Sequence, residues 1–251
     1  MNRLYSLPKP VIFAHRGASL YAPENTLAAF ELAAQQGADA IELDVKLSAD
    51  GEVVVIHDQT VDRTTDGIGK VNHLTLEQLK ILDAGAKFST DFSGEPIPTL
   101  REVFEHLGGR LYINVELTNY NSTFDDLPRK VAAIVRDCGQ EDNVLFSSFN
   151  LFNLLKMKKY LPNNPVAALA SSGFLGFAQR GQPGKLISPE IIHPNIKDVS
   201  LDYIKSQKVK NRRVHVWTVN DPQEMKRLSE LGADGIFTDD PQTAVNLLRQ
   251  G

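Results

Sequence analysis

Eight short runs rich in β-branched and apolar residues alternate with amphipathic helical patterns along the whole chain. Strands that alternate with helices form a parallel sheet, because each helix returns the chain to the edge where the next strand begins. Eight such units in 251 residues are the number that a closed (β/α)8 TIM barrel requires. The expected strands cover residues 11–14, 40–45, 111–116, 144–147, 166–170, 191–193, 214–218 and 235–238, and the helical patterns include 25–36, 127–138, 151–160, 222–231 and 241–249.

An open, doubly wound sheet is the alternative architecture for the same alternation. No Gly-x-Gly-x-x-Gly follows the first expected strand, which weakens the dinucleotide-binding version of that fold. We therefore expect an α/β protein with the TIM barrel fold.

The connection between the second and third expected strands is too long for a simple link. Residues 46–99 begin with a turn signal at 48–51, and the apolar run 53–56 then predicts a strand that folds back beside the second strand. A glycine-punctuated stretch and a short helix from Thr75 follow. Because the segment leaves from the carboxyl end of a barrel strand, we expect an insertion over the barrel mouth, not a separate core, within a single domain over residues 1–251.

The composition limits the possible partners and locations. The net charge of −4 argues against nucleic acid as the main partner, because phosphate backbones are held by dense positive charge. No apolar stretch approaches the ~20 residues needed to span a bilayer, and the first ten residues lack the apolar core of a signal peptide. We therefore expect a cytoplasmic protein without a stable membrane anchor, and the oligomeric state stays open. The single cysteine, Cys138, is expected to be a small core residue.

Three carboxylates lie at the ends of expected strands. Glu42 and Asp44 are two residues apart in one strand, so both face the barrel axis, and Glu116 ends the next barrel strand in the same way. Three inward carboxylates repel one another in a low dielectric unless a cation is present. Because oxygen ligands favour a hard cation, the pattern predicts one divalent ion, Mg²⁺ or Ca²⁺. The alternative is a network of ion pairs with Arg or Lys.

Two histidines and an arginine accompany these acids. His15 ends the first strand and His57 ends the apolar run in the insertion, so both can reach the mouth. Imidazoles suit the two proton transfers that cutting a phosphodiester needs, one from the nucleophile and one to the leaving alkoxide. The planar fork of Arg16 suits a phosphate oxygen. Taken singly, each histidine also fits a hydrogen-bonded strand end, and Arg16 also fits a clamp on Glu42.

Several longer strings extend this pattern in order from about residue 10 to residue 241. They are HRGASLYAPENTLAAF, GADAIELDVKLSADGEVVVIHD, RTTDGIGKV, IPTLREVF, SSF, VHVWTVND and GADGIFTDDP. Together they closely resemble the glycerophosphodiester phosphodiesterase family. The resemblance implies a (β/α)8 barrel with a small insertion after strand two. It also implies hydrolysis of glycerophosphodiesters to sn-glycerol 3-phosphate and an alcohol, with one divalent metal.

The resemblance further implies roles for single residues. The matching positions are the metal ligands Glu42, Asp44 and Glu116, the acid–base pair His15 and His57, the phosphate-binding Arg16, and an apolar wall of Phe149 and Trp217 beside the glycerol. Taken alone, the two aromatic residues would be core residues.

Strand three departs from the family pattern. The family often has Glu-x-Lys there, with the lysine near phosphate, whereas this chain has Glu116-Leu117-Thr118. In a strand, Thr118 points to the same side as Glu116, so its hydroxyl can donate one hydrogen bond to substrate. It cannot supply a unit charge, which predicts a phosphate site with less positive charge.

Four other polar residues have structural interpretations. Asn25 is expected to cap the first helix, His193 to belong to a turn, and His73 and His106 to lie at the surface or in packing contacts.

Two other functions remain as alternatives. A lysophospholipase D-type activity on lipids would need an apolar groove, for which residues 173–177 are the candidate. A non-catalytic binding barrel would be expected to lose at least one of the six polar site residues, and all six are present.

Overall fold

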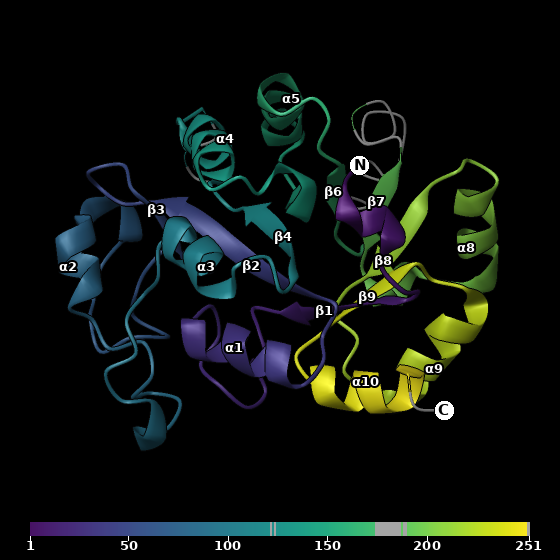
Figure 1. Ribbon diagram of the computed structural model, residues 1–251, viewed down its shortest axis with the longest axis horizontal. Coiled ribbons are helices and arrows are strands. Elements are labelled where there is room, and N and C mark those ends of the chain that lie inside the picture. The colour runs from purple at the N-terminus through teal and green to yellow at the C-terminus, as the bar shows by residue number, and fades with distance from the viewer. Residues whose placement is uncertain (121, 123, 174–186, 188–189, 250–251) are drawn as a thin grey trace.

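The computed structural model describes residues 1–120, 122, 124–173, 187 and 190–249. Its centre is a closed barrel of eight parallel strands with helices around it (Figure 1). The strands pair in the order β1-β9-β8-β7-β6-β5-β4-β2, and the pairing of β1 with β2 closes the ring. This closure confirms the TIM barrel and excludes the open sheet. The barrel strands are β1 (Val11–His15), β2 (Ala40–Leu47), β4 (Tyr112–Leu117), β5 (Val144–Ser148), β6 (Val166–Ala170), β7 (Ile191–Pro194), β8 (Arg213–Val216) and β9 (Gly235–Thr238).

Short polar side chains fix the start of several helices. Thr26 caps α1 (Leu27–Gln35) by accepting a hydrogen bond from the backbone N–H of Ala29. The expectation that Asn25 is this cap is wrong, because its φ is +60° and its side chain turns to Asp44 instead. The other α-helices are α2 (Leu76–Lys80), α3 (Leu100–Leu107), α4 (Leu127–Asp137), α5 (Leu151–Tyr160), α8 (Leu201–Lys208), α9 (Pro222–Leu231) and α10 (Pro241–Arg249), and 3-10 turns cover Arg3–Ser6, Val71–His73, Thr90–Phe92, Glu141–Asn143 and Ile196–Asp198.

Within the described ranges, no helix combines the length and the apolar composition needed to cross a bilayer. His73 and His106 are exposed, as predicted, and His106 contacts Glu31. Cys138, just after α4, is half-buried against the main core.

Successive side chains along each barrel strand point to opposite sides of the sheet. One hydrophobic core therefore lies between the strands and the helices, and a second one lies inside the barrel. Outward residues such as Ile12 and Ile41 pack against the helices, whereas Phe13 and Phe237 fill the barrel interior. On each strand, every second residue points into the barrel, and the inward residues at the carboxyl ends of β1, β2 and β4 are polar. The inward residues of these strands are Phe13 and His15 on β1, Ala40, Glu42, Asp44 and Lys46 on β2, and Tyr112, Asn114 and Glu116 on β4.

Two histidines lie in the barrel interior below the mouth. His193 Nε2 is 3.1 Å from His215 Nδ1, and both side chains are fully buried beside Phe237 or Phe13. Burial lowers the pKa of His215 to about 3 and that of His193 well below its usual value. Both rings are therefore neutral packing groups at physiological pH. The expectation of a turn role for His193 is wrong, because β7 carries its ring into the core.

The long connection after β2 begins with β3 (Val53–Val55), which pairs antiparallel with β2 as the sequence predicted. Thr75 caps α2 in a capping box with Gln78. The segment also has a small apolar cluster of its own, which was not expected. A connection as long as residues 46–99 must bury some apolar surface of its own to stay ordered. The cluster consists of Val54, Ile56, Val61, Val71, Leu79, Ala84 and Ile97.

Candidate active site

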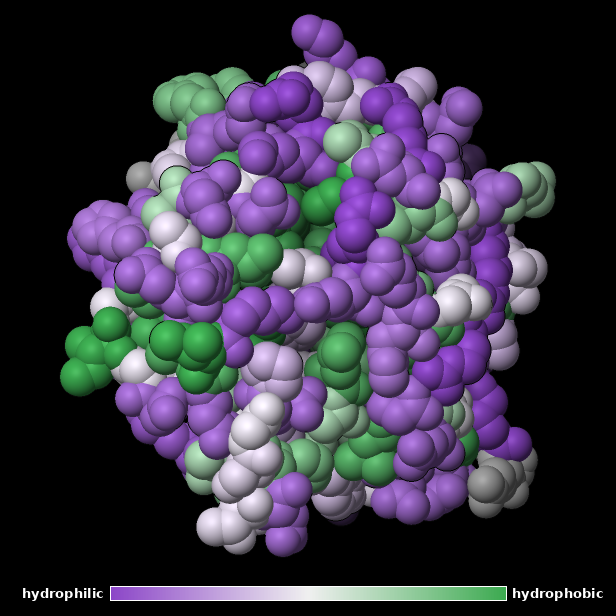
Figure 2. Space-filling model, turned by 60° about the vertical axis from the view of Figure 1, so that its left-hand side comes forward, coloured by the Kyte–Doolittle hydropathy of each residue, from purple (hydrophilic) through white to green (hydrophobic). Residues whose placement is uncertain are grey.

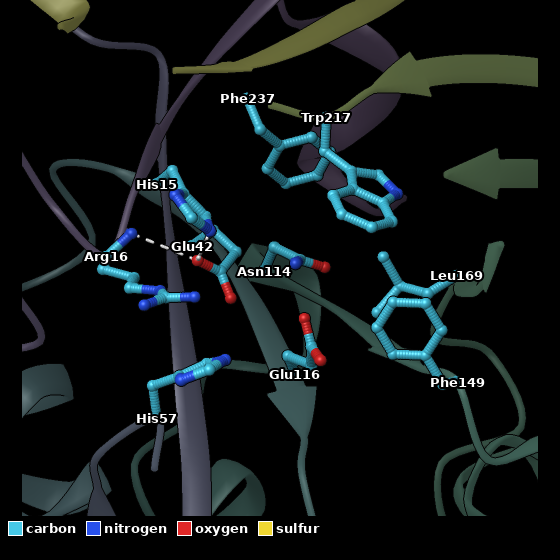
Figure 3. Close-up of a pocket in the computed structure, with 10 residues that line it drawn as sticks. All are labelled: His15, Arg16, Glu42, His57, Asn114, Glu116, Phe149, Leu169, Trp217 and Phe237. Carbon is cyan, nitrogen blue, oxygen red and sulfur yellow. Dashed lines mark hydrogen bonds and ion pairs between the residues drawn. The ribbon is translucent and has the colours of Figure 1, made fainter. Parts of the chain in front are cut away.

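A cavity of about 90 Å³ opens at the carboxyl ends of the barrel strands. Figure 3 shows polar groups on one side of it and apolar side chains on the other, with Glu42 and Asn114 between them. The ten lining residues are His15, Arg16, Glu42, His57, Asn114, Glu116, Phe149, Leu169, Trp217 and Phe237. Five of the six residues expected to bind substrate or transfer protons, all except Thr118, thus line this pocket together with two of the three expected metal ligands.

The three acids form one cluster, because Asp44 pairs with Glu116 across the β2–β4 ladder. Carboxylate oxygens of Glu42, Asp44 and Glu116 lie within 4.8 Å of one another. Burial, together with the charges of Asp44 and Glu116, raises the pKa of Glu42 well above its usual value. Burial and Asp44 likewise raise the pKa of Glu116 to about 8. Such a cluster is unfavourable when fully ionised without a cation.

The donor set fits a hard divalent ion. Glu42 Oε1 and Asn114 Oδ1 are buried and have no hydrogen-bond partner among the described residues. Buried oxygens of this kind are normally satisfied by a partner, a water or an ion. Asn25 orients Asp44, the acid of the cluster that does not line the pocket. Asn25 Nδ2 donates to Asp44 Oδ2 at 2.9 Å, and Asn25 Oδ1 accepts from the Asp44 backbone N–H at 3.3 Å. Oxygen-only ligands select Mg²⁺ or Ca²⁺ over softer metals.

His15 is oriented by a carboxylate from the far end of the chain. Its Nδ1 lies 2.7 Å from Asp239 Oδ1, and its Nε2 lies 4.0 Å from Glu42 Oε2. Asp239 also accepts hydrogen bonds from Ser19 and Asn220. The hydrogen bond from His15 lowers the pKa of Asp239 even though burial opposes this. The carboxylate therefore stays ionised and keeps the Nε2 atom of His15 turned to the acid cluster.

His57 is likewise oriented by a carboxylate, here from Asp58 in the insertion. Its Nδ1 lies 2.7 Å from Asp58 Oδ1, and Arg63 binds the same carboxyl group through Nε at 2.6 Å. The hydrogen bonds from Arg63 and then from His57 lower the pKa of Asp58 to about 2. Figure 3 shows His57 on the opposite side of the pocket from Trp217 and Phe149.

Arg16 reaches the cluster in two ways. Its backbone N–H donates to Glu42 Oε2 at 3.1 Å, which requires its φ of +58°. Its side chain donates to Glu24 at 2.9 Å and lies 3.4 Å from Asp44 Oδ2. Burial opposes the charge of Arg16, but Asp44 and Glu24 outweigh it and raise its pKa. The guanidinium thus stays charged beside the pocket, and its contact with phosphate stays a prediction.

Gly17 makes the turn after Arg16 possible. Its φ is +86°, and a Cβ there would lie 2.6 Å from Ala29 Cβ and 2.7 Å from the Ala29 carbonyl carbon. We expect Gly17→Ala to lower the free energy of unfolding by about 2–5 kcal/mol, through left-handed strain and overpacking. Urea titration measures this. Gly94→Ala is the matched control, because its φ is +88° with nothing within 4 Å, so strain alone should cost about 1–2 kcal/mol. Equal losses in the two variants would contradict the packing argument.

The apolar side of the pocket is built from aromatic rings. Phe149 and Trp217 meet edge to face, with ring centroids 5.6 Å apart. The indole N–H donates to the backbone oxygen of His193 at 2.8 Å, which fixes the ring. Both residues line the pocket, so the expected wall faces the cavity, and its contact with glycerol stays a prediction.

Thr118 is not among the residues that line this pocket. Its hydroxyl is buried, donates to the Val45 carbonyl at 3.0 Å, and accepts from Lys46 Nζ at 2.6 Å. The expectation that only a neutral hydroxyl lies at this position is therefore wrong, because the ammonium group of Lys46 on β2 contacts Thr118. Burial lowers the pKa of Lys46 to about 8, although Asp44 and Glu116 oppose this. Direct contact of Thr118 with substrate stays a prediction.

Sequence reasoning missed several residues of the site, and four polar ones among them are instructive. Asp239 lies in the DDP string after the last strand, and its position at a strand end was a usable signal. Lys46 continues the inward row of Glu42 and Asp44, so the period of two pointed to it. Asn25 and Asn114 gave no signal, because asparagine is common in turns and strands without a functional role.

Comparisons with known proteins agree with this geometry. The sequence profile of the glycerophosphoryl diester phosphodiesterase family matches residues 15–243. A glycerophosphodiester phosphodiesterase of Caldanaerobacter subterraneus subsp. tengcongensis is 40% identical over 97% of this chain and 99% of its own. A solved phosphodiesterase of Oleispira antarctica, in complex with the product sn-glycerol-3-phosphate, is 33% identical with a TM-score of 0.89 over 98% of each chain. A glycerophosphodiester phosphodiesterase structure from Agrobacterium tumefaciens is 34% identical with a TM-score of 0.80, over 93% of this chain and 97% of its own. The chain therefore belongs to the glycerophosphoryl diester phosphodiesterase family, as the resemblance of its sequence predicted.

Proposed function

We propose that the protein hydrolyses glycerophosphodiesters to sn-glycerol 3-phosphate and an alcohol, with one divalent cation and two proton-transferring histidines. The observation that carries the proposal is a carboxylate cluster flanked, in one pocket, by two histidines that each rest on a carboxylate. The product in the Oleispira antarctica structure is the one this reaction would release, which supports the assignment. The cytoplasmic location expected from the sequence stays a prediction.

Glu42, Asp44 and Glu116 would hold the cation, Mg²⁺ or Ca²⁺. When bound, such an ion offsets charge that develops on the phosphoryl oxygens. Arg16 adds a fixed positive charge at the same place and is oriented by Glu24. The phosphodiester would lie between this polar floor and the aromatic wall of Phe149 and Trp217.

One histidine would take a proton from the nucleophile, and the other would give a proton to the leaving alkoxide. Because Asp239 and Asp58 each occupy Nδ1, the Nε2 atom of each ring exchanges the proton. The nucleophile is either water or the substrate's own glycerol 2-hydroxyl, and the latter gives a cyclic phosphate that is then hydrolysed.

The other two functions have less support. The lysophospholipase D-type activity depended on an apolar groove at residues 173–177, of which 174–177 lie outside the described residues. A non-catalytic barrel is disfavoured because the six polar residues are all present, and five of them line the pocket directly.

An assay of released sn-glycerol 3-phosphate tests the proposal. Purified protein is incubated with glycerophosphocholine, glycerophosphoethanolamine, glycerophosphoinositol and a lysophospholipid, each with added Mg²⁺, Ca²⁺ or a chelator. We expect metal-dependent turnover of the first three substrates. Turnover of the lysophospholipid alone would favour the lipid-directed alternative, and no turnover of any substrate would refute the proposed reaction.

A further inference from the structure

A second cavity of about 200 Å³ lies between the insertion and the loop after β4. The face that carries the insertion is largely hydrophilic (Figure 2). Two of the lining residues, Leu47 and Val71, are apolar, and the rest carry hydrogen-bonding groups. These are Lys46, Gln59, Asn72, Asn119, Ser122 and Asp125.

Several groups at this cavity come two residues after catalytic residues in the chain. Lys46 comes two residues after Asp44 on β2, so its side chain starts on the same inward face, about 6.6 Å nearer the barrel rim. Thr118, which holds the ammonium of Lys46, continues the ladder two residues after Glu116. Gln59 comes two residues after His57, and its Nε2 donates to the Thr118 carbonyl at 3.2 Å.

Lys46 is the distinctive group in this cavity. Only 4% of it is exposed, and its Nζ donates to Thr118 Oγ1 at 2.6 Å and to the Thr118 carbonyl at 3.1 Å. An ammonium group has three N–H donors, so these contacts with described residues leave one for a ligand. The long-range electrostatic partners of Lys46 are Asp44, Glu116 and Asp58, all on the catalytic side.

Asp125, the one carboxylate among the described residues that line this cavity, is held in place by hydrogen bonds from neutral groups. Asp125 accepts hydrogen bonds from Asn119 Nδ2 at 2.5 Å, the Leu127 backbone N–H at 3.0 Å, and Ser122 Oγ at 2.7 Å. A ligand therefore meets the buried ammonium of Lys46 and the carboxylate of Asp125 together with amide and hydroxyl groups. Among the described residues, no aromatic side chain lines this cavity, and aromatic faces are what favours binding of a quaternary ammonium group.

We propose that this cavity is the subsite for the leaving alcohol and that it selects polyhydric alcohols over cationic ones. The inference rests on the proposed function, with the glycerol arm against Phe149 and Trp217. Figure 3 shows His57 across the pocket from that wall, so the second ester arm runs past His57 toward Lys46 and Gln59. Hydroxyl groups of that alcohol accept from Lys46 and bond to the amides, whereas the trimethylammonium group of choline has no N–H or O–H and gains none of these hydrogen bonds.

Substrate selectivity tests the subsite. We expect kcat/KM for glycerophosphoinositol to exceed that for glycerophosphocholine by about tenfold, the size of one charge-assisted hydrogen bond. Lys46→Met keeps the length of the side chain and removes its charge, so the preference should fall to about threefold or less. Gln59→Leu, at a half-buried position outside the strands, should reduce the preference in the same direction. Lys205→Met, at an exposed position on α8, is the control and should leave both constants unchanged.

The ratio of kcat/KM for glycerophosphoinositol to kcat/KM for glycerophosphocholine tests the subsite, whereas hydrolysis of either substrate tests the proposed function. A lysine that only stabilised the acid cluster would lower both constants equally when replaced, and this result would overturn the subsite while hydrolysis itself stood. Equal constants in the unmodified protein would overturn it as well. Failure to hydrolyse either substrate would instead refute the proposed reaction.

Discussion

Replacing His57 with alanine is expected to lower kcat by about 10²–10⁴-fold while leaving the fold intact. The imidazole is 40% exposed at the pocket, and its ring makes no contribution to the core. Its loss removes one proton transfer from the proposed reaction and leaves the acid cluster unchanged. His15→Ala should show a loss of the same size, because each ring serves one of the two transfers. Steady-state kinetics with glycerophosphoethanolamine, together with circular dichroism of each variant, measures both effects.

His73→Ala is the matched control, because that histidine is exposed on the insertion and lines no pocket among those described. Its kcat should equal that of the unmodified protein. The kcat values of Asp239→Asn and Asp58→Asn should lie between those of the active-site His→Ala variants and that of His73→Ala. These two substitutions leave the imidazoles in place and disturb only their orientation and electrostatic surroundings. A folded His57→Ala protein with nearly normal kcat would remove His57 from the reaction.

The barrel and the acid cluster were predictable because both follow from local patterns, the barrel from the alternation of strands with helices and the cluster from the side-chain period within a strand. Alternation with a period of two put Ala40, Glu42 and Asp44 on one face of a strand, and β2 has that arrangement. The strand ends were predicted only to within one or two residues: β2 was expected over 40–45 and covers Ala40–Leu47, and β8 was expected over 214–218 and covers Arg213–Val216. Metal binding and proton transfer were then expected from residue chemistry alone.

The residues that orient the site's side chains were not predictable, because they are distant in sequence and come together only in the folded structure. Asp239 reaches His15 across 224 positions of sequence, and no local pattern reports such a pair. Asn25 looked like a helix cap, yet Thr26 beside it has the capping geometry and frees Asn25 to bind Asp44. The comparison of Thr118 with the family's lysine considered one strand alone, whereas the neighbouring strand supplies the ammonium of Lys46.

Chelation is expected to abolish activity, and Mg²⁺ or Ca²⁺ should restore it. The three acids would otherwise leave mutually repelling charges at the point where the phosphodiester must bind. The ion should also raise the melting temperature, since a ligand that binds only the native state stabilises it. Glu42→Gln is the decisive variant. It removes one repelling charge, so without metal it should be at least as stable as the unmodified protein, while metal should no longer restore activity. Full activity after exhaustive chelation would refute the metal site.

The stabilisation by metal should grow as the pH rises from about 5 to 8. Burial, and then Asp44, raise the pKa of Glu116 to about 8 in the folded chain without metal, above the ordinary glutamate value of about 4.3. Between these two values the folded state binds more protons than the unfolded state, so this group's contribution to stability is present at low pH and is lost as the pH rises through 8. A cation binds the ionised carboxylates and must displace those protons, which weakens its binding at low pH. Melting temperatures with Mg²⁺ and with chelator should therefore diverge with increasing pH. In Glu42→Gln, where one ligand charge is gone, the two melting curves should stay close together at every pH, and a divergence as large as in the unmodified protein would place the cation elsewhere.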